Sequence, residues 1–307
     1  MEVKNNYIFG GVQMDSYWST YVQESKELYS SRALRFHDGN KELWLKALQI
    51  KDGMKVLEVG CGGGVFCHKI KEYLPKTDIT GLDFDTGHIE YAKVKSAELN
   101  LNCNFVNCDA TDLPFEDDIF DICFSHTVIN FCEPKPFIKE QYRVLKPNGK
   151  IIILCIINSP NKPEWWIPTD DCDEKVLFDK LWAEARKNEL SDIKKYENNE
   201  LRYFEYLQEQ GFKDISADVF AVLSYSPSFA DVSDKMAIDQ INEGRLSELC
   251  SAQKAFRLAP NCLSTDEFNS MLEMINKRYD NMIDKYKSGD KSWDYRASTI
   301  LAISGMK

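Results

Sequence analysis

The sequence predicts the α/β fold class, with a mostly parallel sheet that is covered by helices on both faces. Two observations predict it. Short apolar runs alternate with amphipathic segments between residues 55 and 157, and this alternation is typical of right-handed βαβ units in one parallel sheet. The chain also has 307 residues, of which 43% are hydrophobic, so it can bury a substantial core.

Residues 1–50 are expected to form an N-terminal helical cap. Apolar and aromatic side chains recur in this segment at the spacing of a helix. They are Met14, Tyr17, Trp18, Tyr21 and Leu28 within residues 14–28, and then Leu43, Trp44, Ala47 and Leu48. We therefore predict two helices before the sheet begins.

Residues 51–158 are expected to supply the first five strands. Each strand is a short run of apolar residues, and a helical segment separates one run from the next. The runs are Lys55–Val59, Asp78–Leu82, Cys103–Asn107, Phe120–Ser125 and Lys150–Ile157.

After residue 158, two helical insertions are expected to alternate with two returns to the sheet. The first insertion begins with a turn-rich aromatic stretch, and the second contains a capping box at Ser264 and Glu267 before an apolar helical face. The segments are an insertion at residues 159–195, a sixth strand within residues 196–227, an insertion at residues 228–290 and a seventh strand within residues 291–307.

The charge balance argues against nucleic acid and membrane partners. The formal net charge is -11, so the chain lacks the basic surplus that binds phosphate backbones or anionic membranes. It shows neither an apolar signal core near Met1 nor an apolar run of about 20 residues. The ten cysteines are scattered, and several lie in apolar runs. We expect reduced core thiols in a cytoplasmic protein.

The acidic run at residues 170–174 has two interpretations. It could bind a metal ion, but carboxylates are also favoured at the start of a helix by the helix dipole. The second interpretation is simpler, and neither the cysteines nor the four histidines have the spacing of a zinc site. We predict no metal site.

A glycine cluster follows the first predicted strand, in the segment Val56–Gly64. Such a turn lets the backbone approach a ligand at a helix N-terminus. Dinucleotide-binding loops have the same kind of turn, but Val65 occupies the place of their third glycine. Glu58 also adds a carboxylate beside the loop, which suits a ligand with positive charge and no phosphate. The loop therefore indicates a cofactor site of a different kind.

With its surroundings, this segment resembles the class I S-adenosylmethionine-dependent methyltransferase family of the small-molecule type, in register over about residues 50–157. Val56–Gly64 is similar to the family's first motif, which holds the methionine portion of the cofactor, and the resemblance assigns Glu58, Gly60, Cys61 and Gly62 to it. Ile79–Asp83 is similar to the end of the second strand, where the acid accepts hydrogen bonds from ribose.

Three more segments carry the resemblance. Asn107–Phe115 is similar to the adenine motif, which implies that Asp109 and Ala110 contact the adenine. Phe120–His126 is similar to the fourth strand, and Arg143–Lys150 to the turn into the fifth, with Asn148 in place of the usual second glycine. Asn tolerates a positive φ, so this turn should form.

The resemblance implies a Rossmann-like, seven-stranded, mostly parallel sheet with S-adenosyl-L-methionine as the methyl donor. The sixth and seventh strands come from residues 213–225 and 292–304, and one of them is antiparallel to the rest. Phe84, which follows Asp83, and Ser125, which ends the fourth strand, complete the expected cofactor contacts on the sheet.

His126 and Asn130 are expected close to the reacting sulfonium, because ligands of open parallel sheets lie at the carboxyl ends of the strands. His126 could act as a general base or as a hydrogen-bonding group that orients the substrate. Methyl transfer is an in-line displacement from an activated donor, so alignment and exclusion of water can supply much of the rate. A strictly required base need not exist.

Aromatic and basic side chains outside the sheet supply further candidates. Tyr17 belongs to a segment that folds over the cofactor in related enzymes, although its spacing also fits a packing stripe. Trp165 and Trp166 follow the fifth strand and could line the acceptor pocket or pack the insertion. Three basic residues could recognise an anionic acceptor or simply form an exposed turn: Arg32, Arg35 and His37.

We predict a methyltransferase that acts on a small-molecule acceptor, as a monomer or homodimer. The alternatives are an RNA or protein methyltransferase, a pyridine-nucleotide oxidoreductase, a non-catalytic S-adenosylmethionine-binding protein and an enzyme for arsenite or another thiophilic acceptor. Ser125–Val128 stands where amino-directed DNA enzymes carry an Asn-Pro-Pro-Tyr type motif. Val65 and Asp109 disfavour the oxidoreductase, and the strand positions of the cysteines favour core packing over arsenic chemistry.

Overall fold

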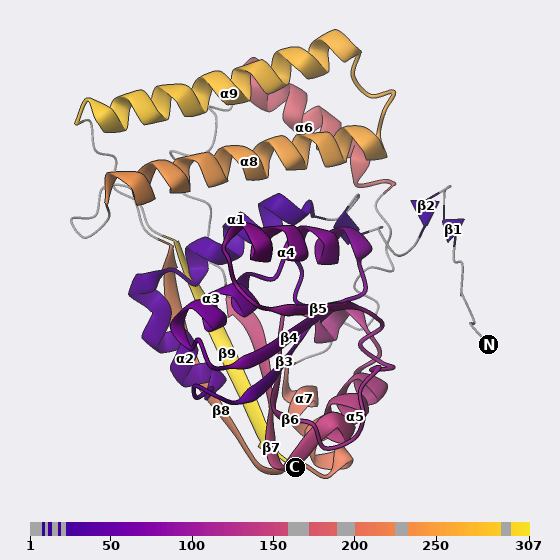
Figure 1. Ribbon diagram of the computed structural model, residues 1–307. Helices are drawn as coiled ribbons and strands as arrows, with labels where there is room; N and C mark the ends of the chain where they lie inside the picture. Colours follow the sequence, from indigo (N-terminus) through magenta and orange to yellow (C-terminus); the bar gives the residue numbers. More distant parts are fainter. Residues whose placement is uncertain are drawn as a thin grey trace.

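A seven-stranded sheet forms the centre of the computed structural model, which describes residues 8–9, 12–13, 18–19, 23–158, 172–188, 200–224, 233–289 and 296–307. Its strand order is β5-β4-β3-β6-β7-β9-β8 (Figure 1). β9 runs antiparallel to its neighbours β7 and β8, and the other adjacent pairs are parallel. This arrangement confirms the Rossmann-like fold class. The strands are β3 (Lys55–Val59), β4 (Asp78–Asp83), β5 (Asn104–Asn107), β6 (Phe120–His126), β7 (Leu145–Asn158), β8 (Lys213–Ser224) and β9 (Arg296–Met306).

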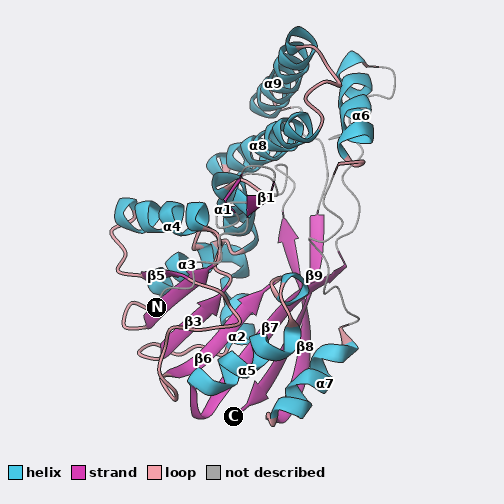
Figure 2. Cartoon of the chain, turned by 90° about the vertical axis from the view of Figure 1, so that its right-hand side faces the viewer, coloured by secondary structure: helices cyan, strands magenta, loops and turns pink. Residues whose placement is uncertain are grey.

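Helices cover both faces of the sheet because its central strands are apolar on both sides. Along β7, Ile152 and Leu154 face one hydrophobic cluster, whereas Ile151, Ile153 and Cys155 face the other. Figure 2 looks onto the face that α5 and α7 cover, and the helices α2, α3 and α4 lie behind the sheet. The helices are α1 (Ser25–Arg35), α2 (Lys41–Leu48), α3 (Val65–Tyr73), α4 (Thr86–Glu98), α5 (Pro134–Val144) and α7 (Leu201–Gln210).

Three further helices form a separate layer beyond the carboxyl ends of the parallel strands (Figure 1). They are α6 (Asp173–Ala185), α8 (Asp234–Leu258) and α9 (Thr265–Lys287), and they share their own hydrophobic cluster. The predicted capping box starts α9, since Glu267 N donates to Ser264 Oγ at 3.2 Å and Ser264 N donates to Glu267 Oε2 at 2.7 Å. An ion pair of 2.9 Å between Arg278 and Glu174 joins α9 to α6.

Contacts also join this layer to α1. Ser247 Oγ of α8 donates to Glu27 Oε1 at 3.1 Å, and Cys250 Sγ donates to Glu24 Oε2 at 3.1 Å. The remaining described elements are a small two-stranded sheet of β1 (Ile8–Phe9) and β2 (Val12–Gln13) and two short 3-10 helices, Asp38–Asn40 and Ile129–Phe131. We propose the chain division given above, with the two helical insertions as additions to the sheet.

The structure corrects two expected boundaries. A continuous helix over residues 14–28 is wrong, because Gln23 and Glu24 are not helical and α1 begins at Ser25, so residues 25–28 are the only part of that range shown to lie in an α-helix. Met14, Tyr17 and Tyr21 lie outside the described residues. The fifth strand begins at Leu145 instead of Lys150, because Leu145 already pairs with Phe120 across an irregular register. Asn148 has the expected positive φ, 64°.

Within the described residues, the structure shows where the acidic run lies and in what state the cysteines are. Asp173 and Glu174 lie in the first turn of α6, and no group of three His, Cys, Asp or Glu among the described residues could hold a metal ion. All ten cysteines are free thiols, and five are buried. No helix in the described ranges is long and apolar enough to cross a membrane.

Candidate functional site

The glycine loop between β3 and α3 is closely packed on several sides. Gly60 N and Cys61 N both donate to Leu82 O at 2.8 Å, which folds the loop onto the end of β4. A Cβ on Gly62, which has a φ of 52°, would lie 2.5 Å from Leu28 Cδ2 of α1. A Cβ on Gly60 would lie 2.4 Å from Val128 Cγ2. The loop therefore has room for glycine alone at these two positions.

Asp83, at the end of β4, binds this loop directly. Its Oδ2 accepts a hydrogen bond from Gly62 N at 2.8 Å, and its Oδ1 accepts one from Asp85 N at 2.9 Å. Burial raises the pKa of the Asp83 carboxyl. Phe84, the next residue, has a half-exposed side chain, at 51%. Two residues that the resemblance places in separate motifs, Gly62 and Asp83, thus touch each other.

Glu58 lies beneath α3, with its side chain only 2% exposed. Its Oε2 accepts hydrogen bonds from Cys67 N at 3.2 Å and from Cys67 Sγ at 3.0 Å. Burial raises the pKa of Glu58 to about 8. The carboxyl group therefore ties the first turn of α3 to β3 in addition to lying under the glycine loop.

The end of β5 carries the two residues expected at the adenine. Asp109 is exposed, and its Oδ1 accepts hydrogen bonds from Thr111 N at 2.8 Å and Thr111 Oγ1 at 2.7 Å. Ala110 packs against the cluster below α5 and α7. Asn107 donates from Nδ2 to the carbonyls of Asp83 at 3.0 Å and Phe84 at 2.7 Å. The Asp109 side chain caps its own turn, and its role towards a cofactor remains a prediction.

The end of β6 holds two buried polar groups on opposite faces. Alternation along the strand places Ser125 on the face of α5 and α7, and His126 between Trp44 of α2 and Phe66 of α3, at ring distances of 5.7 and 5.2 Å. Among the described residues, Ser125 Oγ and His126 Nε2 have no hydrogen-bond partner. Burial lowers the pKa of His126 well below 6.5, and the charges of Arg32 and Arg35 lower it further. The imidazole is therefore neutral at pH 7.

The side chains of Asn130 and His126 belong to opposite faces of the sheet. Asn130 Oδ1 accepts a hydrogen bond from the hydroxyl of Tyr203, which is buried in the cluster under α7. His126 faces the opposite side of the sheet. Tyr17, Trp165 and Trp166 lie outside the described residues.

Trp18 and Ser19, which precede α1, contact the loops that follow β6 and β4. Ser19 N donates to Asp85 Oδ2 at 2.8 Å, and the ring of Trp18 meets that of Phe131 edge to face at 4.6 Å. Ser25 Oγ, at the start of α1, lies 2.7 Å from His88 Nδ1 of α4. These contacts hold Trp18, Ser19 and the start of α1 against the carboxyl edge of the sheet.

Sequence reasoning missed several residues of this site. Hydrogen bonds to neighbouring elements are made by the side chains of Asn107, Asp85 and His88. Of these three residues, only Asn107 belongs to a motif recognised in the sequence, as its first residue. His37, which could have been part of an exposed turn, is buried and accepts a hydrogen bond from Gly39 N at 3.0 Å. Its ring therefore caps a short helical turn, Asp38–Asn40.

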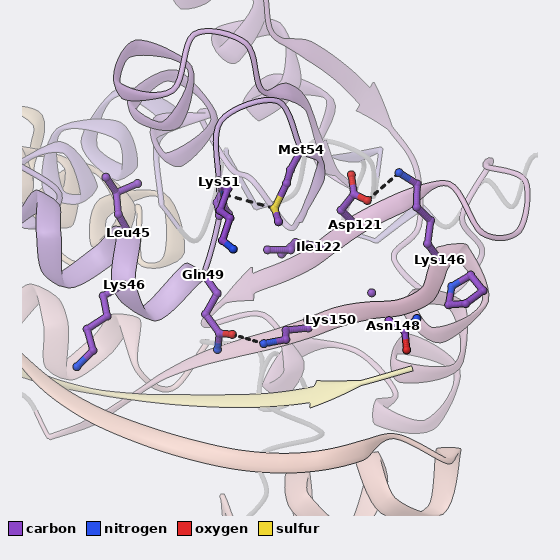
Figure 3. Close-up of a pocket in the computed structure, with 13 residues that line it drawn as sticks. Leu45, Lys46, Gln49, Lys51, Met54, Asp121, Ile122, Lys146, Asn148 and Lys150 are labelled. Carbon is purple, nitrogen blue, oxygen red and sulfur yellow. Dashed lines mark hydrogen bonds and ion pairs between the residues drawn. The ribbon is translucent and has the colours of Figure 1, made fainter.

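A cavity of about 520 Å³ lies at the opposite, amino-terminal edge of the strands (Figure 3). Two of its lysines are engaged by neighbours: Lys146 Nζ donates to Asp121 Oδ1 at 2.7 Å, and Lys150 Nζ donates to Gln49 Oε1 at 2.6 Å. The glycine loop does not line this cavity. We assign no function to it.

Comparisons with known proteins identify a family for about half of the chain. Residues 50–206 match a family model described as a methyltransferase domain. A demethylmenaquinone methyltransferase of Staphylococcus aureus is 35% identical over 112 residues, which cover 36% of this chain and 46% of that protein. A demethylmenaquinone methyltransferase of Listeria monocytogenes is 31% identical over 177 residues, which cover 55% of this chain and 73% of that protein.

A solved structure shares the fold of the whole chain. Phosphoethanolamine N-methyltransferase 2 of Haemonchus contortus, in complex with S-adenosyl-L-methionine, has a TM-score of 0.53 at 16% identity, and the match covers 97% of this chain and 60% of that one. The chain spans less than half the length of the first curated relatives that it matches.

Replacing Gly62 by alanine is expected to weaken binding of S-adenosylhomocysteine by at least about tenfold. The new Cβ would lie 2.5 Å from Leu28 Cδ2, so the Leu28 side chain would have to move from its place on the loop, in addition to the strain of about 1–2 kcal/mol at positive φ. Titration calorimetry would measure the affinity. Gly53→Ala is the matched control, since Gly53 also has a positive φ, 89°, but no atom within 4 Å. Unchanged affinity in Gly62→Ala would show that the loop does not contact the ligand.

Replacing Glu58 by glutamine is expected to change how stability depends on pH. The folded protein holds a proton on Glu58 up to about pH 8, whereas the unfolded chain loses it near 4.5. Glu58 therefore stabilises the fold most at low pH, and this contribution falls as the pH rises from 4.5 to 8. Urea unfolding of both proteins across this range should show the wild type losing stability relative to Glu58→Gln.

The matched control for that experiment is Glu90→Gln, an exposed side chain on α4. Its stability should run parallel to that of the wild type at every pH. If the difference between the wild type and Glu58→Gln is also constant with pH, the Glu58 carboxyl is not buried as described.

Proposed function

The chain belongs to the methyltransferase-domain family, and from this premise we propose that it transfers the methyl group of S-adenosylmethionine to a small-molecule acceptor by in-line displacement. The observation that carries the proposal is the 2.8 Å hydrogen bond from Gly62 N to Asp83. This bond joins the glycine loop to a carboxylate at the carboxyl edge of a parallel sheet, where such folds bind ligands.

The residues of the site fit this cofactor. The loop at Gly60 and Gly62 admits no side chain, and each Asp83 oxygen already accepts one backbone hydrogen bond and retains a lone pair for a hydroxyl donor. When bound, the cofactor supplies a methyl group on a positively charged sulfur. We propose that ten residues contact it: Glu58, Gly60, Cys61, Gly62, Asp83, Phe84, Asp109, Ala110, Ser125 and Tyr17.

We propose that the helices around the glycine loop enclose the bound cofactor and acceptor. Leu28 of α1 packs on Gly62, and Ser25 is held to His88 at 2.7 Å. The layer of α6, α8 and α9 stands beyond the same edge of the sheet (Figure 1). These elements would exclude water and restrict the acceptor to an in-line approach, which supplies rate without acid or base chemistry.

His126 is the residue we propose for the acceptor's nucleophilic atom. Its buried, neutral Nε2 can accept a hydrogen bond or a proton from that atom. Asn130, Trp165 and Trp166 are proposed to line the remainder of the acceptor site. The Asn130 side chain is held by Tyr203, so its contribution would be to position the loop after β6.

We also propose a cytoplasmic location and an acceptor that is neither nucleic acid nor membrane. The ten free thiols favour a reducing compartment, and the net charge of -11 opposes phosphate backbones. A monomer or a homodimer is compatible with the proposal.

Binding tests separate this function from its alternatives. Calorimetry should detect binding of S-adenosylhomocysteine and none of NADH, and Asp83→Asn should weaken the former by about tenfold, because a carboxylate accepts hydroxyl hydrogen bonds more strongly than an amide. Binding of NADH alone would refute the proposal. Binding of S-adenosylhomocysteine, with no label transferred from methyl-labelled cofactor to any component of a metabolite extract, would favour a non-catalytic binding protein.

His126 is expected to work in its neutral form over the whole physiological pH range. The initial rate of label transfer to the extract should stay constant between pH 7.5 and 6, because burial lowers the pKa of His126 well below 6.5. His126→Asn should reduce the rate by roughly a hundredfold, within the range of general-base contributions, while S-adenosylhomocysteine affinity is unchanged. A fall in rate centred near pH 6.5 that disappears in His126→Asn would mean that the ring is exposed to water.

A further inference from the structure

We propose that the methyl acceptor carries an anionic group, a carboxylate or a phosphate, and that the guanidinium of Arg32 binds this group beside His126. The proposal rests on the proposed function, because it names the substrate class of the same site. Four features of the described residues carry it: the face of α1, the partial burial of Arg32, its lack of an ion pair and the unpartnered nitrogen of His126.

The first feature is the placement of α1. Leu28 of this helix packs on the glycine loop at Gly62. Arg32 follows four residues later, so it lies on the same face of the helix, one turn further along. The face that covers the cofactor loop therefore continues directly into a guanidinium.

Trp44 connects the end of α1 to the end of β6. Its Nε1 donates to the carbonyl of Arg35 at 2.8 Å, and its ring meets the His126 ring edge to face at 5.7 Å. The last turn of α1, which contains Arg32, is thereby held against the end of β6, where His126 stands. The charges of Arg32 and Arg35 both act on His126, which agrees with this placement.

Arg32 is a half-buried cation without a carboxylate partner in the described residues. Its Nη1 donates to Ser31 Oγ at 3.2 Å, and the described residues offer it no ion pair within 4.0 Å. Burial is the main cause that lowers the pKa of Arg32 to about 9, and the charge of Arg35 adds to it; Glu27 and Glu243 act in the other direction. Removing a guanidinium from water without pairing it is costly. An anion that arrives with the substrate would supply the missing partner.

The unpartnered nitrogen of His126 indicates where the acceptor's reacting atom would lie. The side chain is 6% exposed, and its Nε2 has no hydrogen-bond partner in the described part of the chain. A neutral ring nitrogen and a half-buried cation thus occur near the end of one strand. Arg32 would hold the acceptor by its anionic group, while Nε2 of His126 would face the nucleophilic atom.

A structural role for Arg32 makes a different prediction. Arg32 lies in the last turn of α1, where the helix dipole favours a cation. If that were its role, its replacement would lower the melting temperature with no ligand present. If Arg32 awaits an anion, replacement by glutamine should leave the melting temperature unchanged or raise it, because an unpaired, half-buried charge is removed.

The test uses the full chain saturated with S-adenosylhomocysteine and three probes of similar shape: phenyl phosphate, benzoate and uncharged benzamide. Calorimetry and thermal unfolding are expected to detect at least one of the two anions and not benzamide, and the anion that binds more tightly distinguishes phosphate from carboxylate. Arg32→Gln should weaken that binding by at least about tenfold, since a hydrogen bond to a charged group is lost. Arg32→Lys should lose less, because the charge remains but the two-pronged geometry does not.

Lys26→Gln is the matched control, since it removes one positive charge from an exposed position on the same helix. It should leave anion binding unchanged. The proposal is overturned if the loaded protein binds neither anion, if both Arg32 variants bind it as the wild type does, or if Lys26→Gln weakens it equally. Failure to bind S-adenosylhomocysteine would instead refute the proposed function itself, and this inference with it.

Discussion

The hydrogen bond between the backbone of the glycine loop and the carboxylate of Asp83 is the contact on which the rest of the site depends. Together with the two bonds that Leu82 O accepts, it closes β3 onto the end of β4 and turns the chain into α3. α1 can then lie directly on the loop because the position it covers, Gly62, has no side chain. Substituting that glycine would therefore disturb two elements at once. Local backbone geometry, rather than a catalytic side chain, sets the dimensions of the site.

Burial shifts the pKa values of the acidic groups in this region. It raises the pKa of both Glu58 and Asp83, since the surrounding helices exclude the water that would stabilise the anions. Burial also lowers the pKa of His126 and Arg32. Acids and bases are thus both displaced towards their neutral forms. A ligand that brings positive charge to the acids and an anionic group to Arg32 would compensate their charges without water, which links binding to electrostatic complementarity.

The sequence predicted those features of the fold that depend on residues close together in the chain. Strand β3 and the capping box of α9 follow from apolar runs and from the spacing of Ser264 and Glu267, because neighbouring residues decide them. The link from Asn107 to the carbonyls of Asp83 and Phe84, and that from Ser25 to His88, join residues more than 20 positions apart and have no sequence pattern. The start of α1 was also missed, since helical spacing continued through an extended residue, Glu24. The direction of the His126 ring required the packing of three other elements to be known.

The pairing of β8 with β9 has a consequence for how such a protein can change over time. Ser224 and Arg296 are register partners, so the chain leaves the sheet and re-enters it at neighbouring points although residues 225–295 intervene. The cost of closing a loop grows only slowly with its length, and the strands do not depend on what the loop contains. The α8–α9 hairpin can therefore be lengthened, shortened or exchanged by evolution while the sheet and its glycine loop stay intact. New specificities can arise in this layer without loss of the older machinery beneath it.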